Sequence, residues 1–211
     1  MADLSGLLQR IRDEFAASEQ KLKDFQARQI EAHHARQERE AKLEQIFVQL
    51  QETIRPRLEA LAKEFGDRLQ VAPLIKPGRR QATMQVKSPL ATIKLQLSAC
   101  ANSDVTKLVL AYDLDILPIL MEFERHSEIE FPIDGVQPEA IAAWLDERIV
   151  GFVRTYLSLH QNEYYLKDQM VNDPVANVRF PKFAAAAQRQ RGRETVYFIS
   201  EETAAEFDKQ K

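Results

Sequence analysis

Apolar positions in the first quarter of the chain recur at intervals of four and three residues. Residues 4–54 contain no proline and, beyond Gly6, no glycine, and they are rich in good helix formers. One seam of the predicted helix holds Leu4, Leu8, Ile11, Phe15, Leu22 and Phe25, and its register returns at Leu43, Ile46 and Leu50. This spacing is typical of a coiled coil and predicts a homo-oligomer joined through the seam.

The seam is interrupted between its two apolar parts, where polar or small residues occupy its positions: Gln29, Ala32, Arg36 and Arg39. One uninterrupted zipper is therefore not predicted, and packing of an amphipathic helix on its own domain is the alternative. The length of the helix favours self-association. About 50 helical residues span about 75 Å, farther than a domain of this size can cover.

The pattern changes after the helix. Pro56 predicts a kink or restart, and Gly66 predicts the end of the helix. Beyond Gly66 apolar and polar residues alternate within 81–87, 91–97 and 107–114, which predicts half-buried strands. The short turns between these segments predict an antiparallel β-meander.

A second long helix is predicted from Pro138 to about Gln169, with proline in its first turn. Its apolar residues repeat at three and four and form a stripe that can cover one face of the meander. The predicted fold class is α+β in three parts. These are a long helical segment at 1–66, kinked near Pro56, a meander with its covering helix at 67–170, and a small C-terminal module at 171–211.

Composition restricts the class of protein. Hydrophobic residues make up 45% and charged residues 29%, and no apolar run approaches the roughly 20 residues of a membrane span. Cys100 is the only cysteine, which excludes an intrachain disulfide and a thiolate-rich zinc site. These features, with an N-terminus unlike a secretory signal, predict a cytoplasmic protein. The net charge of -3 argues against a nucleic-acid partner.

Charge is distributed unevenly along the predicted sheet. Residues 69–103 carry five basic side chains and no acid, whereas residues 113–130 carry six acids against one arginine. A further segment, 179–193, is purely basic. We therefore expect opposed charged patches, either side by side on the open sheet face or across a contact between subunits.

Two segments near the C-terminus, DPVANV and YFISEETAAEF, begin at Asp173 and Tyr197. As a set they resemble the YHS family, whose frame in words is D-P-V-C-G-M followed by Y-Y-F-C-S-x-x-C and a downstream phenylalanine. The resemblance covers about the last forty residues. It places the family's cysteines at Ala176, Ile199 and Thr203, so all three thiolate positions are replaced.

The resemblance implies a scaffold that is kept and a metal site that is lost, because these replacements offer no soft ligand. We expect no metal and no cofactor, and a small apolar core that includes Ile199 in place of the metal. The family also implies association with metal handling and with some oxygenase and transporter chains.

No catalytic constellation occurs in the chain, so an enzyme is not predicted. The loop that holds Lys76, Arg79 and Arg80 is a candidate anion-binding turn. The leading hypothesis is a non-enzymatic, oligomeric scaffold protein that also docks an unidentified protein partner. The alternatives are a module that binds a small apolar ligand between the meander and the Trp144 helix, and an accessory subunit of a metal-dependent enzyme or metal-handling system.

Overall fold

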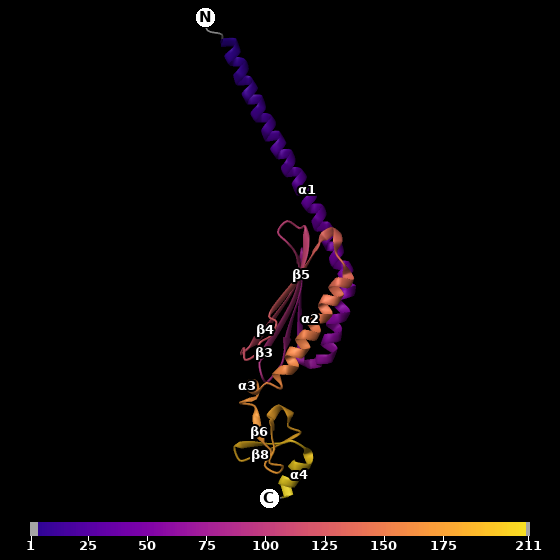
Figure 1. Ribbon diagram of the computed structural model, residues 1–211, viewed down its shortest axis with the longest axis vertical. Helices are drawn as coiled ribbons and strands as arrows, with labels where there is room; N and C mark the ends of the chain where they lie inside the picture. Colours follow the sequence, from indigo (N-terminus) through magenta and orange to yellow (C-terminus); the bar gives the residue numbers. More distant parts are fainter. Residues whose placement is uncertain (1–3, 210–211) are drawn as a thin grey trace.

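One helix extends over almost a third of the chain. The computed structural model describes residues 4–209, and in it α1 spans Leu4–Phe65, 62 residues, or about 93 Å. The helix continues through Pro56 without a restart. It ends before Gly66, whose φ of +54° is a backbone conformation that glycine adopts without strain. Figure 1 shows the first half of α1 projecting away from the rest of the molecule.

The five central strands form one antiparallel sheet in the order β1-β2-β3-β4-β5. The strands are β1 Leu69–Lys76, β2 Arg79–Val86, β3 Thr92–Ala101, β4 Lys107–Leu117 and β5 His126–Pro132. The predicted meander and the α+β class are confirmed. The sequence did not predict β1, which follows the short 3-10 turn Gly66–Arg68 and forms one edge of the sheet.

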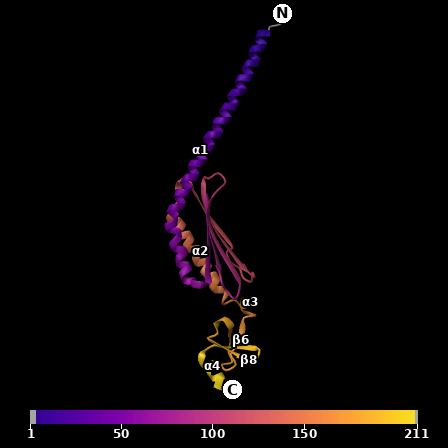
Figure 2. The same cartoon turned by 180° about the vertical axis from the view of Figure 1, so that it is seen from behind.

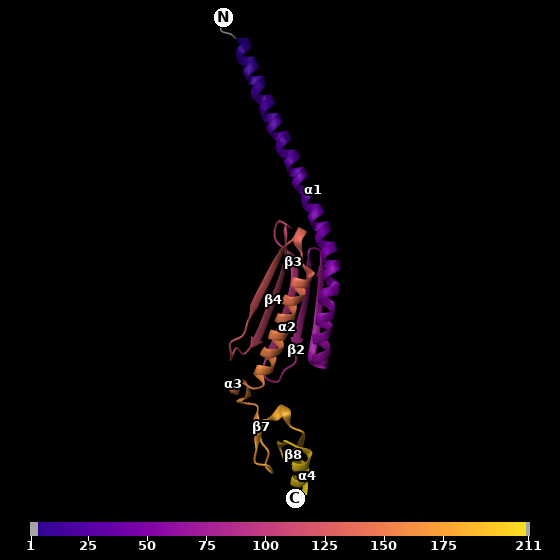
Figure 3. The same cartoon turned by 45° about the vertical axis from the view of Figure 1, so that its right-hand side comes forward.

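Two helices cover one face of this sheet. α2 spans Pro138–Leu159 and follows a 3-10 turn at Ile133–Gly135, and Figure 3 shows it lying beside the second half of α1 on the same side of the strands. Burial alternates strictly along β4, where every second residue from Leu108 to Ile116 is buried. The main core therefore lies between the sheet and the two helices, and the opposite sheet face is open.

The second helix is shorter than its pattern predicts. α2 ends at Leu159, and a separate turn, α3 Glu163–Leu166, follows it. The side chain of Asn162 accepts a hydrogen bond of 2.9 Å from the N–H of Tyr164 and caps α3. This local capping restarts the helix where the apolar repeat alone predicts continuity.

The C-terminal part is a small unit at the far end of the molecule from the start of α1 (Figure 2). It contains two hairpins and a helix: β6 Met170–Asn172 with β7 Arg179–Pro181, the 3-10 turn Lys182–Ala184, β8 Ala187–Arg191 with β9 Glu194–Phe198, and α4 Glu201–Lys209. Its own core consists of Ala187, Phe198 and Ala204, with Val175, Val196 and Phe207 packed around them. We call residues 170–209 the tail.

Candidate interaction sites

The first half of α1, residues 4–38, carries an apolar surface that nothing in the described chain covers. We call this segment the arm. All of its leucine, isoleucine and phenylalanine side chains are exposed: Leu4, Leu7, Leu8, Ile11, Phe15, Leu22, Phe25 and Ile30. Six of these are seam positions, and the stretch from Leu4 to Phe25 is about 32 Å long. An exposed apolar surface of this extent marks an interaction site.

The C-terminal part of the predicted seam is buried within the chain itself and is not an exposed contact surface. Leu43, Ile46 and Leu50 are only 1%, 7% and 2% exposed, because they pack into the chain's own core beneath α1. They are therefore unavailable to a second copy in this conformation. The polar break in the seam separates two environments. On its N-terminal side the seam residues of α1 are exposed, and on its C-terminal side they pack into the main core.

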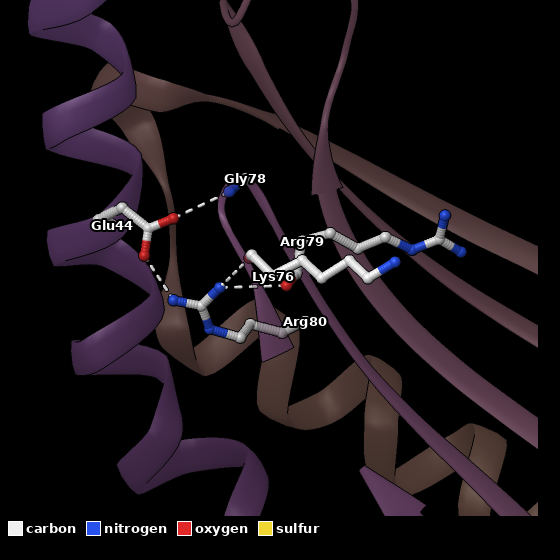
Figure 4. Close-up of polar contacts among 5 residues, drawn as sticks. All are labelled: Glu44, Lys76, Gly78, Arg79 and Arg80. Atoms are coloured by element: carbon white, nitrogen blue, oxygen red, sulfur yellow. Dashed lines mark hydrogen bonds and ion pairs between the residues drawn. The ribbon is translucent and has the colours of Figure 1, made fainter. Parts of the chain in front are cut away.

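The candidate anion-binding turn already holds a carboxylate of the chain. Glu44 of α1 accepts a 2.9 Å hydrogen bond from the N–H of Gly78 and also pairs with Arg80 (Figure 4). The Gly78 N–H lowers the pKa of Glu44; partial burial opposes this shift and Arg80 adds to it. The Arg80 guanidinium also lies 4.6 Å from the centre of the Phe47 ring. These contacts fasten α1 to the β1–β2 turn.

The other two basic residues of the turn are directed elsewhere. Figure 4 shows the side chains of Lys76 and Arg79 pointing away from Glu44, and Arg79 donates a 2.8 Å hydrogen bond to Gln81. An external anion at this turn would compete with Glu44 for the Gly78 N–H and Arg80. Anion binding by Lys76, Arg79 and Arg80 stays a prediction. The carboxylate of Glu44 makes it less favourable, because Glu44 already occupies the Gly78 N–H and Arg80.

An apolar cavity of about 460 Å³ lies between α1, α2 and the first four strands. It lies where Ile54 and Leu58 of α1 face the sheet but are only half-buried. The small residues Ala82 and Ala99 line it on the sheet side and leave this space unfilled. Its volume lies within the range of small-molecule sites.

The cavity opens along the edge strand β1. Val71 and Ile75 line it and are 45% and 74% exposed. Pro73 lies between them and has no N–H to offer an added strand. The edge therefore disfavours recognition of a partner by strand addition.

The open face of the sheet carries a polar hollow lined by Lys94, Gln96, Asp113, Asp115, Arg125 and His126. Lys94 and Asp115 are direct cross-strand partners, so the basic and acidic strands adjoin within one sheet. His126 contacts Asp113 at 2.7 Å and Glu128 at 3.7 Å. The hydrogen bond with Asp113 raises the pKa of His126 despite some desolvation. No group of three or more ligands suited to a metal occurs within residues 4–209.

The tail is organised around a buried carboxylate. Asp173 is 0% exposed and accepts four hydrogen bonds. One oxygen accepts from the N–H groups of Val175 and Ala176 at 2.8 and 3.0 Å. The other accepts from the Ile199 N–H at 2.9 Å and the Thr203 hydroxyl at 2.7 Å.

The three replaced cysteine positions of the YHS resemblance therefore all contact one group. Ala176 and Ile199 donate to Asp173 through their backbone N–H groups, and Thr203 donates through its hydroxyl. The expectation that the Ile199 side chain is buried is wrong, because it is 42% exposed. Its backbone N–H faces inward to Asp173, and Phe198 beside it fills the core instead.

Sequence reasoning missed Asp173 and Glu44 as organising residues. Asp173 stands in the sequence Asp-Pro, in which an aspartate that accepts from the next N–H groups is a common turn signal. That local signal predicts the hydrogen bonds from Val175 and Ala176, but it does not predict those from the distant Ile199 and Thr203. Glu44 gives no local signal, since its partners are 34 and 36 residues away.

Comparisons with protein-family models, with curated proteins and with solved structures found no match to this chain. Across residues 4–209 no helix is both long and apolar enough to cross a membrane.

Proposed function

We propose that this protein is a non-enzymatic scaffold that self-associates through the arm and carries the sheet body and the tail as docking units. The observation that carries the proposal is the exposed seam of the arm. Full burial of a leucine or phenylalanine side chain contributes about 1.5–3 kcal/mol. Burial of the exposed parts of six seam residues on each copy therefore provides the apolar driving force for association, which is opposed by the entropic cost of joining two chains.

A matched pair of substitutions tests this proposal. Leu22 lies on the seam and Ile30 lies off it, and the two are 58% and 59% exposed. Leu22→Glu places a charge in the contact and is expected to abolish self-association, measured by light scattering of the full chain. Ile30→Glu makes the same kind of change outside the contact and is expected to leave the mass unchanged. Equal behaviour of the two variants contradicts assembly through the seam.

The tail enters this proposal as a metal-free relative of the YHS family. Its support is the arrangement around Asp173, where Ala176, Ile199 and Thr203 converge on one carboxylate. A buried carboxylate that collects backbone and hydroxyl donors can hold the two halves of a small module together, as a metal does elsewhere. The tail is then a docking unit stabilised by hydrogen bonds and packing.

A second candidate function is the binding of a small apolar ligand, favoured by the cavity beneath α1. Trp144 lines this cavity and is the only tryptophan of the chain, so its fluorescence reports on the site directly. A lipophilic ligand is expected to shift the Trp144 emission and to be retained in native mass spectrometry. Ala82→Phe, which fills the cavity, is expected to remove both signals, and their persistence argues against this site.

A further inference from the structure

The charges beside the seam indicate how two arms pair. Four charged residues flank its central part: Arg12 and Glu19 lie on one side of the seam, and Glu14 and Lys21 lie on the other. All four are exposed. None of them forms an ion pair with another residue of the described chain.

A parallel pair of arms in register brings like charges together. In that arrangement a residue on the flank of Glu14 and Lys21 meets the residue five positions further along the second helix, on the flank of Arg12 and Glu19. Glu14 then faces Glu19 of the second copy, and symmetry makes this repulsion occur twice. The core also pairs Ser18 with Ser18, which leaves a polar gap between apolar layers.

An antiparallel pair reverses both outcomes. If Phe15 packs beside Ser18 of the second copy, the next layers join Ile11 with Leu22 and Leu8 with Phe25. In this pairing, residues of the same flank face each other. Arg12 meets Glu19 and Glu14 meets Lys21, each twice by symmetry. Four opposite-charge pairs replace two like-charge pairs, and the large Phe15 of each copy packs beside the small Ser18 of the other.

We propose that the arm pairs in antiparallel orientation with a second copy, centred between Ala16 and Ala17. This inference rests on the proposed self-association and adds its geometry. Leu43 lies about 26 residues beyond that centre, so the two copies of Leu43 are about 53 residues of helical rise, or about 80 Å, apart. The two bodies therefore lie at opposite ends of the assembly, and their docking surfaces are separated.

Charge reversal at Glu14 distinguishes the two orientations by the sign of its effect. In the antiparallel pair Glu14→Lys faces Lys21 and weakens association, with an expected rise in Kd of about tenfold. In the parallel pair the same change converts the contact with Glu19 into an attraction and strengthens association. Asp13→Lys is the matched control, because the neighbouring Asp13 lies on the outer face of the arm and its reversal changes net charge equally.

The measurement is sedimentation equilibrium of the full chain at low ionic strength, with circular dichroism to verify that each variant stays helical. The double variant Glu14→Lys with Lys21→Glu is expected to restore the original Kd. Tighter association of Glu14→Lys overturns the antiparallel orientation and leaves the scaffold proposal intact, and an effect no larger than that of Asp13→Lys also overturns it. A monomeric unmodified chain contradicts the scaffold proposal itself.

Discussion

Replacing Asp173 by asparagine tests whether the buried carboxylate holds the tail together. The amide has the same shape as the carboxylate but keeps only one acceptor oxygen, and its NH2 group is a donor. Each carboxylate oxygen accepts two hydrogen bonds. Whichever way the amide is placed, two donors lose their acceptor and meet an N–H group.

The expected destabilisation of the tail is about 3 kcal/mol, because a hydrogen bond to a charged group contributes about 1.5–3 kcal/mol and local relaxation recovers part of the loss. Amide hydrogen exchange measured by mass spectrometry is the assay, since it reports on residues 170–209 separately from the body. Protection of β8 and β9 is expected to fall while protection of β3 and β4 is unchanged. Asp168→Asn, at an exposed position, is the control and is expected to have little effect. Full protection of the tail in Asp173→Asn would show that the charged carboxylate is not needed to hold the tail together.

The same residue predicts how tail stability depends on pH. Burial raises the pKa of Asp173, but the hydrogen bonds from Ile199, Ala176, Thr203 and Val175 outweigh burial and lower the pKa below its ordinary value of 3.8. A lowered pKa in the folded state stabilises the tail above the unfolded-state pKa, and the contribution is lost as pH falls through the folded-state pKa. Exchange protection in β8 and β9 is therefore expected to decline below about pH 4 in the unmodified chain. The Asp173→Asn variant is expected to lack this acid dependence.

Three further predictions concern the tail and the attachment of α1. Ile199→Asp is expected to cost less than about 1 kcal/mol in a urea titration, because that side chain is exposed; a much larger loss contradicts its placement. Elemental analysis is expected to find no stoichiometric zinc, copper or iron, and a chelator should leave the Tm unchanged, whereas one tightly held metal per chain contradicts the tail proposal. Glu44→Gln should increase hydrogen exchange around residues 76–80, because it weakens the bonds to Gly78 and Arg80; unchanged exchange there contradicts the fastening role.

The elements of the fold that the sequence predicted correctly are those with a strong periodicity of apolar residues. The seam of α1 and the alternation in β3 and β4 each repeat over many residues, so local irregularities do not obscure them. β1 escaped prediction because it is an edge strand. Only two of its eight residues are even half-buried, and Pro73 interrupts its pattern.

The candidate sites were less predictable because they depend on contacts between distant residues. The apolar repeat of Leu43, Ile46 and Leu50 is the same whether a second copy or the chain's own sheet covers it. Only the folded arrangement separates the two cases. The side chain of Ile199 and its backbone N–H point to different surroundings, which a residue type alone does not specify.

Self-association of this chain through the arm can be measured as the molar mass of the protein in solution. Sedimentation equilibrium of the full chain between about 1 and 50 μM is expected to give a mass that rises with concentration toward at least twice the 24.3 kDa of one chain. A mass that stays at 24.3 kDa across this range would contradict self-association through the arm.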